Sequence, residues 1–147
     1  MDWQENLIVA PTQIRALILQ TKRIAVLGIK TAAQADQPAY YVPEYLFRTG
    51  FDIVPVPVYY PEVKEILGRK VFRKVTEIPD EIDLVDVFRR SHDILGHLDD
   101  LLAKKPKAVW FQSGIRNDVV AQQLARAGIK VVQDHCLMVE HRRLAAI

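Results

Sequence analysis

Short apolar runs alternate with amphipathic helical patterns along this chain of 147 residues. Five of the runs predict strands, and they lie at residues 24–28, 52–56, 84–88, 108–111 and 129–132. Runs that are apolar at nearly every position are typical of parallel strands buried on both faces. Because parallel neighbours need long crossover connections, the helical patterns between the runs predict βαβ units.

The predicted helices are bounded by residues that start or stop helices. Starting residues precede four of the helical patterns, and they are Thr12, Pro38, Ser91 and Asn117. Glycine ends two of these helices, at Gly50 and Gly128. A last helix is expected over residues 137–144. In the less regular segment between the second and third strands, residues 63–67 indicate a helical turn and residues 71–72 a small strand.

Together these elements predict an α/β fold: a Rossmann-like, doubly wound, mostly parallel sheet with helices on both faces. A chain of this length is enough for one domain with a sizeable core. It contains no internal repeat and no linker rich in glycine and serine. We therefore expect a single domain.

Composition narrows the classes of partner. Half of the residues are hydrophobic and 26% are charged, which argues against disorder. Twenty Lys and Arg against 18 Asp and Glu leave a net charge of +2, which is too balanced to indicate a nucleic-acid partner. No apolar run approaches the roughly 18 residues of a membrane span. The single cysteine, Cys136, cannot form an intramolecular disulfide, and we expect a cytoplasmic location.

The edge of the sheet at the carboxyl ends of its strands is the predicted binding site, as in other doubly wound folds. These ends lie at residues 28–31, 55–58, 88–90 and 112–116. After the first of them, the helix that starts at Pro38 would direct the backbone N–H groups of Ala39 and Tyr40 at an anion.

Cationic side chains at the same edge favour an anionic ligand. In the first loop, Lys30 could supply a charge and Thr31 a hydroxyl. Arg89, Arg90 and Arg116 follow other strands, and several convergent donors are what a polyanion requires. Two simpler interpretations compete with a ligand-binding role. Gly28 permits a tight turn and nothing more, and each arginine by itself is solvated.

Two common nucleotide motifs are missing. Ile29 and the residues after it do not continue a G-x-G-x-x-G fingerprint, and no Walker A sequence occurs. The end of the second strand reads Pro55-Val56-Pro57-Val58 and has no carboxylate to bind a ribose, since Asp52 lies at the wrong end. NAD and ATP chemistry are therefore disfavoured.

The chain offers no pattern typical of a catalytic or metal site. His92 and His97 are five residues apart, and His135 and His141 are six apart, so neither pair has the i, i+4 spacing of two ligands on one helix face. Cys136 could be an activated thiolate at a helix start, although a buried, apolar role is more common for a lone cysteine. We expect no metal and assign no catalytic residue.

An ordered set of motifs resembles the stand-alone bacterial and archaeal CoA-binding proteins, which are similar to the CoA-binding domain of the succinyl-CoA synthetase alpha subunit. The resemblance runs from about Arg23 to Leu144. It is carried by IAVLG at 24–28, PAYYV at 38–42, ILGRKV at 66–71, DVFR at 86–89, WFQSGIRN at 110–117 and DHCLMVE at 134–140.

The resemblance implies a Rossmann-like domain that binds coenzyme A, which we expect to span residues 23–147. Residues 1–22 precede the resemblance, and we expect them to form a helical segment packed on this domain. The residues implied for the pyrophosphate are Gly28, Ile29, Lys30, Thr31, Pro38, Ala39 and Tyr40. Those implied to flank the adenosine are Pro55, Val56, Pro57, Phe88 and Arg89. Gln112, Ser113 and Gly114 would line the path of the pantetheine arm, and Arg89 or Arg90 would bind the 3′-phosphate.

The function implied is non-catalytic binding of coenzyme A or an acyl-CoA. One alternative is a detached subunit of an acyl-CoA synthetase, because the related alpha subunit carries its phosphorylated histidine in a second domain that this chain lacks. Another is a redox sensor in which Cys136 pairs with the CoA thiol. Two departures fall inside the implied site: the loop between Gly28 and Pro38 is longer than in the family, and Pro57-Val58 replaces the usual Asn-Pro.

Overall fold

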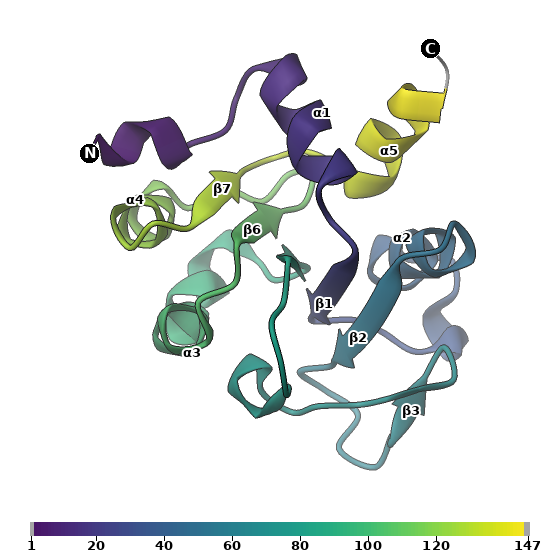
Figure 1. Ribbon diagram of the computed structural model, residues 1–147. Coiled ribbons are helices and arrows are strands. Elements are labelled where there is room, and N and C mark those ends of the chain that lie inside the picture. Colours follow the sequence, from purple (N-terminus) through teal and green to yellow (C-terminus); the bar gives the residue numbers. More distant parts are fainter. Residues whose placement is uncertain (1, 146–147) are drawn as a thin grey trace.

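Five parallel strands form the central sheet of the computed structural model, which describes residues 2–145 (Figure 1). The strand order is β2-β1-β5-β6-β7. The strands are β1 (Arg23–Leu27), β2 (Asp52–Val56), β5 (Leu84–Val87), β6 (Ala108–Phe111) and β7 (Lys130–Val132). Each agrees with its predicted range to within one residue at either end. The predicted α/β, doubly wound sheet is therefore confirmed.

Helices cover both faces of the sheet, as Figure 1 shows. On one face lie α1 (Pro11–Leu19), α2 (Pro38–Arg48) and α5 (Leu137–Ala145), and on the other lie α3 (Leu98–Lys104) and α4 (Asp118–Arg126). Each face has its own hydrophobic cluster, because alternate residues of a strand point to opposite sides. The apolar runs are thus explained by burial on both faces.

Four short 3-10 segments complete the connections. They are η1 (Trp3–Asn6), η2 (Ala32–Gln34), η3 (Val75–Glu77) and η4 (Ser91–His97). The segment before α1 is fixed at the sheet edge, where the Ile8 N–H donates to the Val131 carbonyl at 2.8 Å. No helix within residues 2–145 combines the length and apolarity needed to cross a bilayer.

The irregular segment after β2 differs from the prediction. Residues 65–70 form a hairpin of β3 (Glu65–Ile66) and β4 (Arg69–Lys70), in place of a helical turn at 63–67 and a strand at 71–72. Leu67 and Gly68, at its turn, have φ values of 56° and 70°. Positive φ at both central residues matches the twist of a tight hairpin, so the turn geometry overrides the helical spacing.

Two predicted helix caps are also corrected. Helix α1 begins one residue before Thr12, at Pro11, whose fixed φ suits the first turn. Ser91 starts the 3-10 segment η4 and does not cap an α-helix; its hydroxyl accepts the Arg116 N–H at 3.0 Å instead. The predicted cap at Asn117 is confirmed, since its side chain accepts the Val120 N–H at 3.1 Å.

Candidate functional site

A cleft of about 780 Å³ opens at the carboxyl edge of the sheet, on the face covered by α2 and α5. The strand order reverses between β1 and β5, and such a switch point is where open α/β sheets bind their ligands. Five segments line the cleft. They are the loop at Lys30, the start of α2 at 37–41, residues 88–91 after β5, residues 112–115 after β6, and the start of α5 at 136–139.

Gly28 brings the ends of β1 and β5 close together. Its φ is +89°, and a Cβ at this position would overlap the Phe88 carbonyl oxygen and come within 3.2 Å of Arg89 Cδ. Only glycine fits such a close approach. Of the two neighbours predicted with it for the pyrophosphate, Ile29 is buried in the hydrophobic cluster, whereas Lys30 lines the cleft.

The loop after β1 is fastened to the start of α2. The Lys30 N–H donates to the Ala39 carbonyl at 3.0 Å, and Lys30 Nζ donates to the Gln37 side-chain carbonyl. Pro38 occupies the first turn, as predicted. The Tyr40 N–H already donates to the Gln37 carbonyl, so the backbone donor that remains at this helix start belongs to Ala39.

Thr31 makes its hydrogen bonds within its own loop. It caps η2, with its hydroxyl donating to Gln34 Oε1 at 2.8 Å and accepting the Ala33 N–H. Its side chain lines a separate hollow beside Tyr60 and Leu67, outside the cleft. The structure therefore divides the predicted pair, with Lys30 at the cleft and Thr31 away from it.

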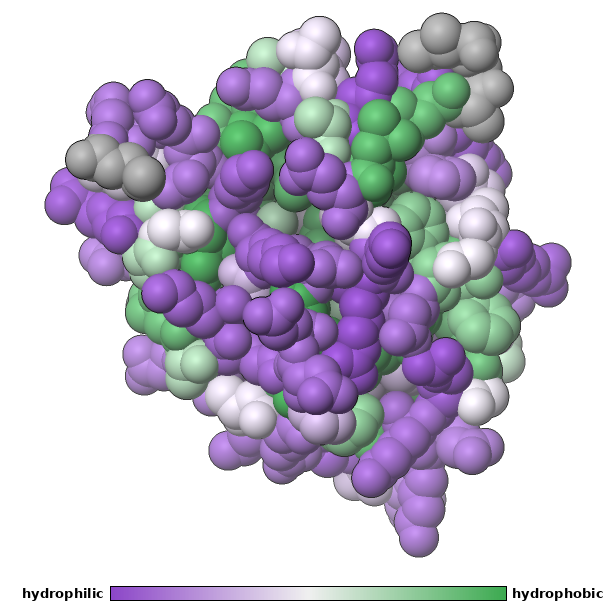
Figure 2. All heavy atoms as spheres, viewed as in Figure 1, coloured by the Kyte–Doolittle hydropathy of each residue, from purple (hydrophilic) through white to green (hydrophobic). Residues whose placement is uncertain are grey.

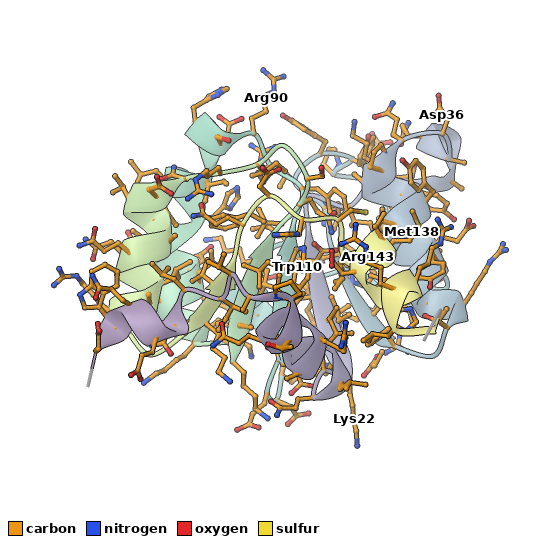
Figure 3. All side chains as sticks on the ribbon, turned by 90° about the horizontal axis from the view of Figure 1, so that it is seen from above. Lys22, Asp36, Arg90, Trp110, Met138 and Arg143 are labelled. Carbon is orange, nitrogen blue, oxygen red and sulfur yellow. The ribbon has the colours of Figure 1, made fainter. Side chains whose placement is uncertain are left out.

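Arg89 is a largely enclosed cation of the cleft, with a side chain only 15% exposed. Its guanidinium lies 3.4 Å from the Tyr59 hydroxyl and 3.7 Å from an Asp93 carboxylate oxygen. Its Nε is buried and has no acceptor among residues 2–145. The hydrogen bond from Arg89 lowers the pKa of Tyr59. Arg90 is exposed, and in Figure 3 it points outward, away from the molecule.

Of the residues of the second strand that were predicted to flank the adenosine, two are buried and one lines a second cavity. Pro55 and Val56 are buried within β2, but Pro57 lines a cavity of about 560 Å³ beyond the end of β1. His97 lies in the same cavity, and its pKa is lowered by burial and by the nearby Arg89 charge.

The end of β6 supplies the floor of the main cleft. Gln112 is buried, while Ser113 and Gly114 are exposed at the rim. The Gly114 N–H donates to Asp134 Oδ1 at 2.6 Å, which fixes the turn. Arg116 lies elsewhere: it pairs with Asp118 at 3.0 Å and lines a hollow near Trp3.

A buried carboxyl below the floor was not anticipated from the sequence. Asp86, in β5, is fully buried, and Gln112 Nε2 donates to its Oδ1 at 2.6 Å. Burial raises the pKa of Asp86 to about 8, an effect that the Gln112 hydrogen bond partly offsets. The signal that could have found it is an acidic residue inside an otherwise apolar strand.

Cys136 and Met138, at the start of α5, also line the cleft. Trp110 Nε1 donates to the His135 carbonyl at 2.7 Å and so positions the loop that carries Cys136. Figure 3 places Trp110 in the interior and Met138 on α5 beside α2. Within residues 2–145, no group of three or more His, Cys, Asp or Glu side chains is arranged to bind a metal.

Comparison with known proteins assigns a family to this architecture. Residues 22–142 match the family described as CoA binding domain. The uncharacterized protein YneT of Bacillus subtilis (strain 168) is 33% identical over 129 residues, which cover 88% of this chain and 92% of that protein.

Solved structures share the fold. A Thermus thermophilus structure is 39% identical, with a TM-score of 0.83, and the match covers 92% of this chain and 99% of that one. A dinucleotide forming acetyl-coenzyme A synthetase 1 of Ca. Korarchaeum cryptofilum is 22% identical, with a TM-score of 0.61. There the match covers 75% of this chain but 25% of the synthetase chain, and it shows a shared fold.

Proposed function

Because this chain belongs to the CoA binding domain family, we propose that it binds coenzyme A, free or acylated, in the cleft between α2 and α5 and catalyses no reaction of its own. The observation that carries the proposal is a cleft at the topological switch point with Lys30 and Arg89 on its lining. Coenzyme A is an elongated polyanion, which suits an open cleft with cations along it.

The phosphate groups and the pantetheine arm of the ligand have chemical counterparts in the cleft. Lys30 and the Ala39 N–H at the start of α2 form the donor set for the pyrophosphate, where the helix dipole favours negative charge. The buried Arg89 Nε needs an acceptor, and a phosphate oxygen supplies one. Gln112 and Ser113 line the remaining path, which is the one that the pantetheine arm would follow.

Ligand selectivity tests the proposal. In isothermal titration calorimetry, coenzyme A should bind more tightly than NAD or ATP, because these lack the pantetheine arm. Equal affinities, or no binding of coenzyme A, would refute it. Lys30→Met should weaken binding about tenfold by removing a charge-assisted contact. Lys22→Met is the matched control, since Lys22 is exposed and in Figure 3 lies on the opposite side of the molecule from Arg90, which lines the cleft.

The phosphate contacts can be told apart with dephospho-coenzyme A. If Arg89 binds the 3′-phosphate, Arg89→Met should bind coenzyme A and dephospho-coenzyme A equally, whereas the unaltered protein should prefer coenzyme A. If only Arg90→Met removes that preference, the exposed arginine carries the contact. A non-catalytic role predicts that acetyl-CoA incubated with the protein releases no free thiol above the rate in buffer.

One observation favours a second candidate function: Cys136 lines the same cleft. In a redox sensor, its thiolate would attack the disulfide of oxidised coenzyme A, forming a mixed disulfide and releasing one coenzyme A thiol. After incubation with oxidised coenzyme A, mass spectrometry should then show one coenzyme A molecule attached to the protein, and none in Cys136→Ser. A catalytic partner chain is a separate prediction, which co-purification would test.

A further inference from the structure

Asp86 lies directly below the cleft, on the face of the sheet that carries it. Its lateral neighbours are Val26 of β1 and Trp110 of β6, and paired residues of parallel strands point to the same side. Val26 and Trp110 belong to the hydrophobic cluster under α2 and α5. Gln112, the residue directly after β6 and two after Trp110, lines the cleft. Asp86 thus lies one layer beneath the floor of the cleft.

The hydrogen bond between Gln112 and Asp86 leaves one oxygen of each side chain without a hydrogen-bond partner in the part of the chain that the structure describes. Gln112 Nε2 donates to Asp86 Oδ1 at 2.6 Å. Asp86 Oδ2 is buried and has no partner among residues 2–145. Within the same residues nothing donates to Gln112 Oε1, although Gln112 lines the cleft. The bond therefore holds the amide by its nitrogen and leaves its carbonyl oxygen free to accept from a ligand in the cleft.

We infer that Asp86 is a positioning residue, which holds the Gln112 amide so that Gln112 Oε1 accepts an N–H from an amide group of the bound ligand. The inference rests on the proposed function, because coenzyme A carries amide N–H groups in its pantetheine arm. A carbonyl acceptor fixed from below discriminates against ligands that lack such a donor, since an acceptor that the bound ligand covers without satisfying is unfavourable.

The surroundings of Asp86 determine whether its carboxyl group is protonated when it positions Gln112. The titratable side chains on this face are Tyr40 and Tyr45 of α2, His135 and Cys136 before α5, and His141 of α5, whose Nδ1 lies 2.8 Å from the Tyr45 hydroxyl. Of the charged groups of these helices, Glu44 pairs with Arg48 and Glu140 with Arg143, while Arg142 lies over the Tyr45 ring. Burial raises the pKa of Asp86 and the Gln112 hydrogen bond lowers it, and among residues 2–145 no cation compensates a carboxylate there.

Ligand binding should consequently weaken at alkaline pH. A polyanionic ligand in the cleft brings negative charge above Asp86 and raises the pKa of this carboxyl further, so the bound state favours the protonated acid. Affinity should be constant below about pH 8, where the free protein is already protonated, and should fall above it, by at most about tenfold per pH unit.

Titration of coenzyme A from pH 6.5 to 9.5 into four proteins tests the inference. Asp86→Asn keeps the acceptor oxygen and cannot ionise, so its affinity should match the unaltered protein at pH 7 and lose the alkaline fall. Asp86→Ala and Gln112→Met remove the positioning bond or the acceptor, and each should weaken binding about tenfold. Asp86→Asn also controls for titration of the ligand itself. Unchanged affinity in Gln112→Met, or an alkaline fall that persists in Asp86→Asn, would overturn the inference.

A ligand-free measurement separates this inference from the proposed function. The side-chain amide NMR signal of Gln112 should shift with a midpoint near pH 8 in the unaltered protein and show no such shift in Asp86→Asn. If that shift occurs but coenzyme A does not bind at any pH, the proposed function fails while the Asp86–Gln112 device stands. A Gln112 signal independent of pH refutes the device itself. If Asp86→Ala does not fold, Gln112→Met and the pH profiles still decide.

Discussion

At the scale of single residues, the properties of two positions, Gly28 and Asp86, depend on the residues packed around them. Gly28 meets the backbone of the neighbouring strand end, and a side chain there has no space. Asp86 sits among apolar side chains with one hydrogen bond to support it. In both cases the residue fits the molecule through contacts made by distant parts of the sequence.

Gly28→Ala should destabilise the fold strongly. The added Cβ meets the Phe88 carbonyl, and φ of +89° strains any L-residue, so we expect a loss of at least about 2 kcal/mol in the free energy of unfolding. Gly128→Ala is the matched control, because Gly128 has a similar φ of +85° but open space around it. It should lose only about 1 kcal/mol. Equal losses in urea unfolding would show that the close approach does not matter.

Asp86→Asn should stabilise the protein at neutral pH. The pKa of Asp86 rises from an ordinary value of 3.8 to about 8 on folding, so the folded chain binds more protons between these values. Its contribution to stability is therefore greatest below pH 4 and is lost as the pH rises toward 8, by about 1.4 kcal/mol per pH unit. Urea unfolding of both proteins at pH 5 and pH 7 measures the effect. A stability difference that does not grow with pH would contradict the raised pKa.

At the scale of elements, helix starts hold the loops that form the site. Asn117 caps α4 through the Val120 N–H, and its Nδ2 also donates to the Ser91 carbonyl at 3.0 Å. The Asn117 N–H in turn donates to Gln133 Oε1 at 2.7 Å. One cap thereby joins the segment after β5, the start of α4 and the segment after β7.

Asn117→Ala should cost about 1–2 kcal/mol, because the cap and the link to Ser91 are lost together. Asn117→Ser retains a capping oxygen and should lose less. Thermal unfolding followed by circular dichroism gives both values. If serine were no better than alanine, the cap would not be the source of the stability.

At the scale of the whole molecule, the N-terminal segment completes one face of the sheet. Ile14, Leu17 and Ile18 of α1 join the cluster beneath α2 and α5, and α1 lies beside α5 in Figure 1. In the same view the surface is mostly hydrophilic, with hydrophobic residues in small separate patches (Figure 2). The apolar face of α1 is thus used inside the molecule.

Ile18→Ala should destabilise the whole protein by about 2–4 kcal/mol, since it opens a cavity in the cluster that α1 shares with the sheet. Leu19→Ala, next along the helix but 71% exposed, should change stability by less than about 0.5 kcal/mol. Tryptophan fluorescence and circular dichroism should report one shared transition for both variants. Two separate transitions would mean that α1 unfolds independently of the sheet.

The sequence by itself determined the strands, most helix boundaries and the family. The strands and helix boundaries follow from local patterns, such as apolar runs, Pro38 at a helix start and Asn117 at a cap. The family follows from ordered motifs, and the match of residues 22–142 to the CoA binding domain confirms it. The Leu67–Gly68 turn escaped the prediction because a spacing of apolar residues does not report φ.

Only the tertiary structure decided which candidate residues share a cleft. Lys30, Arg89 and Gln112 come together at the switch point, whereas Thr31 and Arg116 turn to other hollows although they lie in the same predicted loops. The side-chain directions follow from local hydrogen bonds, and the raised pKa of Asp86 follows from packing by strands far apart in the chain. Burial is a property of the assembled sheet, and no short stretch of sequence contains it.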